Sequence, residues 1–76
     1  MTRGKRRAAR ALGVREANAI AANLGRELRR TRTSLRWTQR RVGDRVGLSQ
    51  AEISKLEAGS GARAPIETWV AIGIAL

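Results

Sequence analysis

Arginine supplies most of the chemistry available to this chain. Lys and Arg together number 16 against 6 Asp and Glu, which gives the 76 residues a formal net charge of +10. A guanidinium group presents forked donors that match phosphate oxygens, whereas a lysine ammonium is a point charge. His and Cys are both absent, so the usual general base, zinc ligand and thiol nucleophile are missing. We therefore expect a protein that binds an anionic partner, and neither an enzyme nor a holder of a metal or another cofactor.

The positive charge is concentrated in two blocks. Residues 1–15 hold six basic side chains and no acid, and residues 26–45 hold eight arginines. The first block, up to about residue 10, has the composition of a disordered basic arm whose alanines allow a helix once a polyanion neutralises the arginines. We divide the chain into this N-terminal arm, residues 1–15, and one domain, residues 16–76. Charge alone fits DNA, RNA and an anionic membrane surface equally well.

Apolar spacing and cap residues predict a pair of short helices in the middle of the chain. Thr38 is expected to cap a helix over residues 39–46, and Gly47 suits a left-handed position at its end. Ser49 and Glu52 have the spacing of a capping box that begins a second helix. Because the link between the two helices is so short, they must meet at a sharp corner.

Two further helices are expected on either side of this corner. Ile20, Leu24 and Leu28 recur every four residues and share one face of a helix over about residues 16–35. Pro65 suits the first position of a last helix, 66–76, which is apolar nearly all round. No strand pattern is present, so the sequence predicts an all-α bundle of about four helices.

The last helix is also the most apolar part of the chain. It is too short to span a bilayer, and the basic N-terminus lacks the long apolar run of an export signal. We therefore expect no membrane association, and a location in the cytoplasm or nucleoid. One neighbouring helix cannot cover the apolar faces of residues 66–76, so a second copy, a protein partner or the rest of a longer protein is expected to cover them.

The combined spacing from residue 38 to residue 59 resembles the helix-turn-helix of phage repressor and Cro-like proteins, also called the xenobiotic-response-element family. The residues that carry this resemblance are Thr38, Gln39, Val42, Val46, Gly47, Ser49, Gln50, Ile53, Ser54, Leu56, Glu57 and Gly59. The likeness covers about residues 24–76. It implies a compact lambda-repressor-like bundle, usually of five helices, so the fifth is missing here. It also implies a transcriptional regulator or the DNA-binding half of an antitoxin. Proteins of this family are often dimeric and place the second helix of the motif in the major groove of DNA.

The resemblance assigns base-reading roles to the second motif helix. Gln50 matches a leading glutamine that pairs with adenine. Lys55 would donate to guanine, Ala51 would contact a thymine methyl group, and Ser54 lies beside them. Gln50 and Lys55 have the simpler alternative of being solvated surface residues. Glu52 is better explained by the capping box than by a contact with cytosine.

Other residues are expected to hold the DNA backbone or the motif itself. The candidate phosphate contacts are Gln39, Arg40, Arg41, Ser60 and Arg63. Arg32 and Glu57 match a partly buried ion pair that ties the first helix to the recognition helix. Arg40 and Arg41 have the alternative of forming a solvated helix face. Trp37 is expected in core or interface packing, with stacking on an unpaired base as its alternative.

Two positions depart from the family pattern. Arg36 stands where the family usually has glycine, which predicts a strained or remodelled turn. Gly43 stands where the family usually has alanine, which is expected to weaken its helix by up to about 1 kcal/mol. Two alternative functions remain open on the sequence: a basic RNA-binding protein that uses the arm and first helix, and a protein-interaction module that uses residues 66–76.

Overall fold

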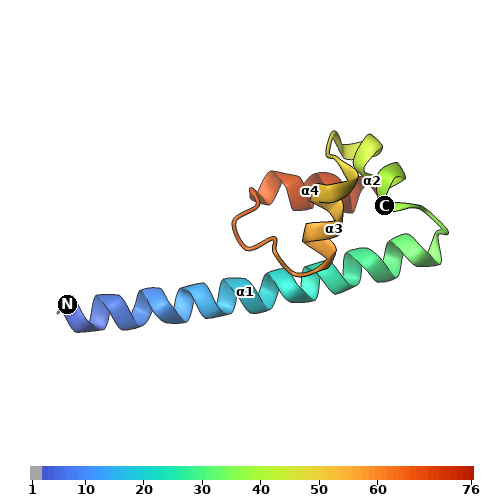
Figure 1. The fold of residues 1–76 in the computed structure, drawn as a ribbon. Helices are drawn as coiled ribbons and strands as arrows, with labels where there is room; N and C mark the ends of the chain where they lie inside the picture. Colours follow the sequence, from blue (N-terminus) through green and yellow to red (C-terminus); the bar gives the residue numbers. More distant parts are fainter. Residues whose placement is uncertain (1–2) are drawn as a thin grey trace.

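The computed structural model describes residues 3–76 and consists of four α-helices (Figure 1). They are α1 (Arg3–Ser34), α2 (Gln39–Val46), α3 (Gln50–Glu57) and α4 (Ile66–Ala75), and the described residues contain no strand. The predicted all-α, four-helix fold is confirmed. Helices α2, α3 and α4 gather on the C-terminal half of α1, while its N-terminal half projects away from them.

Helix α1 is longer than the sequence predicted. It runs without a break for 32 residues, and the molecule measures 50 Å along one axis against 20 Å along the other two. The prediction of disorder up to about residue 10 is therefore wrong from residue 3 onward, and residues 1–2 lie outside the described part. Alanine and arginine are both strong helix formers, and they dominate this segment. The basic arm is thus a helical extension of the domain, and its side chains from residue 4 to residue 16 are exposed.

The corner between α2 and α3 forms as predicted, through local caps. The Thr38 hydroxyl accepts a hydrogen bond from the Arg41 N–H at 3.0 Å, and Gly47 adopts the left-handed conformation with φ of 76°. Ser49 and Glu52 complete the capping box: the Ser49 hydroxyl accepts from the Glu52 N–H at 3.1 Å, and the Ser49 N–H donates to Glu52 Oε1 at 3.4 Å. These bonds satisfy N–H groups at the helix ends that have no partner within the helix.

The core lies where all four helices meet. Its buried members are Leu28, Val42, Ile53, Leu56 and Ile72, with half-buried side chains such as Trp37 and Trp69 packed around them. The predicted apolar face of the first helix is buried only in part: Leu28 is 4% exposed, whereas Ile20 is 56% exposed. Ile20 lies on the same face but at the edge of the bundle, where it lines an open hollow with Ile66 and Trp69 and is covered only in part.

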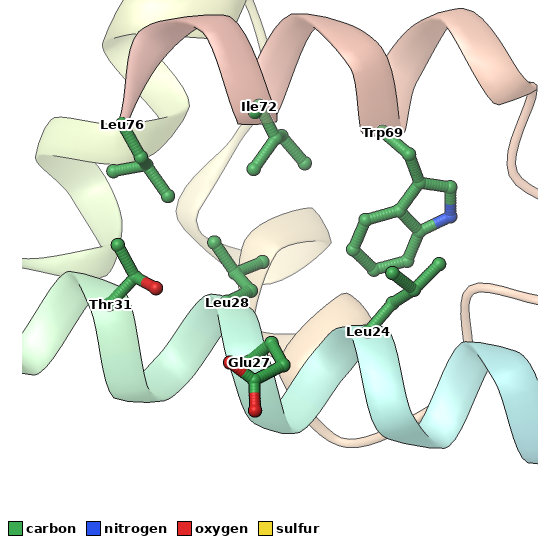
Figure 2. Close-up of a pocket in the computed structure, with 8 residues that line it drawn as sticks. Leu24, Glu27, Leu28, Thr31, Trp69, Ile72 and Leu76 are labelled. Carbon is green, nitrogen blue, oxygen red and sulfur yellow. The ribbon is translucent and has the colours of Figure 1, made fainter.

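Helix α4 leaves much of its apolar surface uncovered. Pro65 precedes the helix as its N-cap, one position earlier than predicted. Ile66, Val70 and Ile74 are 80%, 54% and 81% exposed. Figure 2 shows the other face of α4 packed over α1, around a cavity of about 240 Å³. No helix within residues 3–76 has both the length and the apolar character needed to cross a membrane.

Candidate nucleic-acid interface

The outer face of α3 carries the four residues predicted to read bases. Ile53 and Leu56 are buried beneath the helix, and the opposite side presents Gln50, Ala51, Ser54 and Lys55, all exposed. Within the described residues, the side chains of Gln50, Ser54 and Lys55 make no hydrogen bond or ion pair with the protein. Their donors and acceptors are therefore available to an external partner. We call these four residues the α3 strip.

Glu52 is engaged within the protein. Besides its bond from the Ser49 N–H, Glu52 Oε1 accepts a hydrogen bond from the Ser49 hydroxyl at 3.1 Å. This geometry agrees with the interpretation of Glu52 as a capping residue.

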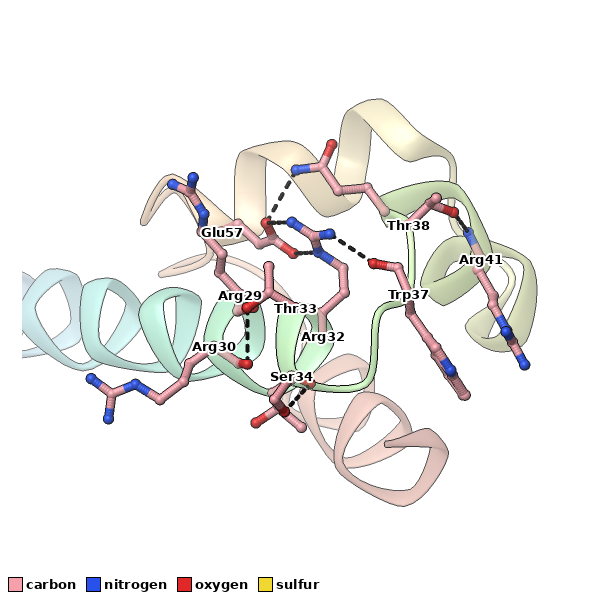
Figure 3. A network of polar contacts seen from close by, with 11 residues as sticks. Arg29, Arg30, Arg32, Thr33, Ser34, Trp37, Thr38, Arg41 and Glu57 are labelled. Atoms are coloured by element: carbon pink, nitrogen blue, oxygen red, sulfur yellow. Dashed lines mark hydrogen bonds and ion pairs between the residues drawn. The ribbon is translucent and has the colours of Figure 1, made fainter.

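A polar network beneath the α3 strip joins three helices (Figure 3). Arg32 Nε donates to Glu57 Oε2 at 2.6 Å, and Arg32 Nη2 donates to Glu57 Oε1 at 2.9 Å. The third guanidinium nitrogen, Nη1, donates to the Trp37 carbonyl oxygen at 2.9 Å. Gln39 Nε2 adds a bond to Glu57 Oε1 at 3.1 Å. The two ion-pair partners, Arg32 from α1 and Glu57 from α3, lie together as the resemblance implied, and Gln39 from α2 supports them.

The network controls the charge state of Glu57. Its side chain is only 4% exposed, and that of Arg32 is 13% exposed. Burial raises the pKa of Glu57, but the hydrogen bonds from Arg32 and Gln39, with the charges of Arg32 and Arg29, outweigh it and leave the pKa below its ordinary value of 4.5. The hydrogen bond to Glu57 in turn raises the pKa of Arg32 despite its burial. Glu57 and Arg32 therefore form a charged pair at neutral pH.

Trp37 stacks with two arginines, a feature that sequence reasoning missed. The Arg41 guanidinium carbon lies 4.3 Å from the centre of the Trp37 ring, and that of Arg45 lies 5.2 Å from it. Both distances fall within the range of cation–π attraction. Figure 3 shows Arg41 and Trp37 pointing away from the Arg32–Glu57 pair. Helix spacing brings Arg41 and Arg45 together on one face of α2, but Trp37 lies before the N-cap Thr38, so its position beside them was not contained in that spacing.

The other predicted phosphate contacts lie on separate elements. Arg40 is exposed in the first turn of α2, and Ser60 and Arg63 are exposed in the loop between α3 and α4. Ser60 lines the same hollow as Lys55, and its N–H donates to the Lys55 carbonyl oxygen at 3.0 Å. Gln39 differs from the rest because it is half-buried and already bound to Glu57.

The two departures from the family pattern have different structural consequences. Arg36 has a φ of 59° and is the non-glycine residue with positive φ in the described part of the chain, so the predicted strain is located at this residue. Gly43 is buried where α2 meets the turn to α3: a Cβ atom added there would lie 2.4 Å from the Leu48 carbonyl oxygen. The absence of a side chain at position 43 therefore allows the two elements to approach closely.

Comparison with known proteins identifies the family. Residues 23–76 match the model of a helix-turn-helix domain family, and this range is most of the chain. The chain therefore belongs to that helix-turn-helix family. No curated protein and no solved structure matches it.

Proposed function

We propose that this protein is a non-enzymatic, sequence-specific regulator of transcription that binds double-stranded DNA, in the manner of a phage repressor or of the DNA-binding half of an antitoxin. The α3 strip carries this proposal, because its polar side chains are exposed and unpaired on a helix whose opposite face is anchored in the core. Membership of a helix-turn-helix family and the net charge of +10 support it. Such a protein acts in the cytoplasm, on the nucleoid.

In the proposed mechanism, α3 enters the major groove and its exposed side chains meet base edges. Gln50 lies in the first turn of α3 and forms paired hydrogen bonds with adenine. Lys55, one turn further on, donates to guanine N7 and O6, and Ala51 contacts a thymine methyl group. The buried Arg32–Glu57 pair keeps α3 at a constant angle to α1, so these contacts are preorganised.

Contacts to the DNA backbone supply most of the affinity. Arg40 approaches from α2, while Ser60 and Arg63 approach from the loop after α3. Gln39 keeps one N–H free after binding Glu57. Arg41, whose guanidinium lies over the Trp37 ring, makes no side-chain hydrogen bond with the protein and retains its N–H groups for a phosphate. The helical extension, which includes Arg6, Arg7 and Arg10, adds affinity that does not depend on sequence.

Selection of bound sequences from a random duplex pool tests this proposal. The wild type is expected to enrich a defined site, and Gln50→Ala is expected to lose discrimination at one base pair by about 1–3 kcal/mol while retaining most of its general affinity. Deletion of residues 1–10 is expected to weaken all sequences alike and to flatten the dependence of affinity on salt. If both changes lower the affinity of every sequence equally, the base-reading role of Gln50 is wrong.

RNA binding is the alternative that one observation favours. The helical extension presents its basic side chains well away from α3, so it offers a polyanion a surface that is independent of the motif. Competition between duplex DNA and structured RNA near physiological salt separates the two functions, because charge alone discriminates weakly between them. Preference for RNA would favour the alternative.

A further inference from the structure

A polar hollow of about 270 Å³ lies between α1 and the edge of the α3 strip. It is lined by Arg29, Arg32, Gln39, Ser54, Glu57 and Ala58. Three helices contribute to it, and Ser54 belongs both to the hollow and to the α3 strip. Figure 3 shows the Arg29 side chain beside Glu57, rising from α1.

The polar groups of this hollow differ in what they can still bind. All three guanidinium nitrogens of Arg32 already donate hydrogen bonds: Nε and Nη2 donate to Glu57, and Nη1 donates to the Trp37 carbonyl oxygen. Gln39 uses one amide N–H for Glu57 and keeps the other. Within the described residues, the Arg29 guanidinium and the Ser54 hydroxyl make no hydrogen bond or ion pair. Free donors from α1, α2 and α3 therefore border one hollow.

The charge balance of the hollow favours an anion. Arg29 and Arg32 are positive and Glu57 is negative, so the lining side chains sum to a single positive charge. Glu57 is the carboxylate that an anion would meet there, but Oε1 accepts from Arg32 and Gln39 and Oε2 accepts from Arg32. Arg32 forms the ion pair with Glu57. The charge of Arg29 also acts on Glu57, but Arg29 forms no ion pair with it, so its guanidinium N–H groups remain available to a ligand.

We propose that Arg29, together with Ser54 and the free N–H of Gln39, binds one phosphate of the DNA backbone at the edge of α3. This inference rests on the proposed function and extends it, because it makes α1 part of the DNA interface and not only a support for α3. It also moves Ser54 from base reading to backbone contact. A phosphate held there fixes how deeply α3 enters the groove, and thereby the register of Gln50 and Lys55 on the bases.

The neighbouring Arg30 provides a matched control. It lies on the same helix, its side chain is 80% exposed, and it is paired only loosely with Glu27, at 3.5 Å. Arg29→Ala is expected to weaken binding to every duplex sequence about tenfold, as for loss of a charged hydrogen bond, and to reduce the slope of log affinity against log salt by about 0.9. Arg30→Ala removes the same charge and is expected to have a clearly smaller effect on both. Arg29→Lys should recover the salt slope but only part of the affinity.

A duplex with single methylphosphonate substitutions identifies the contact directly. At one backbone position, neutralising the phosphate should weaken the wild type about tenfold but leave Arg29→Ala unchanged. Far-UV circular dichroism of both variants checks that the helices remain intact. If Arg29→Ala and Arg30→Ala behave alike, or if no position shows this coupling, the inference fails while the proposed function stands. If the wild type binds no duplex DNA, the proposed function fails and the inference with it.

Discussion

At the scale of single residues, Glu57 determines how α3 is held against α1 and α2. Its carboxylate is almost fully buried, and it accepts hydrogen bonds from α1 and α2 at once. A buried charge is costly unless it is paired, so removing one partner should destabilise the fold more than the pair itself stabilises it. The exposed Arg30–Glu27 pair has no such role, because solvent screens it.

We therefore predict that Arg32→Ala lowers the free energy of unfolding at neutral pH by about 3 kcal/mol, since Glu57 is left buried and unpaired. Glu27→Gln, which breaks the exposed pair, should lower it by no more than about 0.5 kcal/mol. Urea denaturation of both variants provides the measurement. Similar losses in the two variants would mean that burial does not set the energy of the Arg32–Glu57 pair.

The pKa of Glu57 predicts a loss of stability in acid. Because this pKa is lower in the folded than in the unfolded chain, the stabilisation is fully present above about pH 4.5, the ordinary value, and declines as the pH falls through the folded pKa. Glu57→Gln should be less stable than the wild type at pH 7 but should lose less stability on acidification. Thermal unfolding of Glu57→Gln and of the wild type between about pH 2 and 7 provides the measurement. An unchanged acid dependence in Glu57→Gln would contradict this assignment.

Arg36 offers a test of backbone strain. Its φ of 59° is unfavourable for a residue with a Cβ atom, at a cost of about 1 kcal/mol. Arg36→Gly is expected to raise the free energy of unfolding by roughly that amount, whereas Arg36→Ala removes the charge but keeps the strain. Chemical denaturation compares the two, and equal stability of both variants would show that the strain is negligible.

At the scale of elements, the α2–α3 corner depends on a close approach that the caps alone do not explain. Val42 and Ile53 are fully buried on the two helices, and Gly43 lets the turn before α3 pass directly over α2. The sequence suggested that alanine at position 43 would strengthen α2 through its higher helix propensity. In the structure, however, the added methyl group would meet a backbone carbonyl, which cannot move aside as a flexible side chain can.

We therefore predict that Gly43→Ala lowers the free energy of unfolding by about 1–3 kcal/mol. Gly13 is the matched control, because it lies in a helix and an added Cβ would have nothing within 4 Å. Gly13→Ala should leave global stability unchanged or raise it, by up to about 1 kcal/mol, through helix propensity alone. Thermal melting followed by circular dichroism measures both, and stabilisation by Gly43→Ala would refute the packing argument.

At the scale of the whole molecule, the fold leaves an apolar surface beside a highly charged one. Ile66, Val70 and Ile74 of α4 are exposed, and Ile20 of α1 is exposed as well. Exposed apolar side chains of this kind mark interaction surfaces when they are contiguous. The net charge of +10 opposes contact between two copies, and salt screens this repulsion.

We predict that the chain self-associates through α4. Association should be stronger at about 0.5 M salt than at about 0.1 M salt, because the higher salt screens the repulsion between the two positively charged copies more fully. The double variant Ile66→Glu and Ile74→Glu should be monomeric under both conditions. Leu12→Gln, which changes an exposed apolar residue on the helical extension, should associate like the wild type. Sedimentation over a range of concentrations provides the measurement, and a wild type that stays monomeric throughout would show that this face does not mediate self-association.

The sequence by itself determined α2, α3 and the corner between them, because Thr38, Gly47 and the Ser49–Glu52 box act through hydrogen bonds to neighbouring backbone. The length of α1 was not predicted, since the basic composition of its first residues suggested a disordered arm, whereas their alanines and arginines favour a helix. Only the tertiary structure decided which arginines are available to a partner. Arg29 and Arg32 are alike in type and lie three positions apart, but Glu57, brought in from α3, forms its ion pair with Arg32 and leaves the Arg29 guanidinium without a hydrogen bond or ion pair. Such a distinction depends on contacts between residues distant in the chain, and local sequence patterns do not contain them.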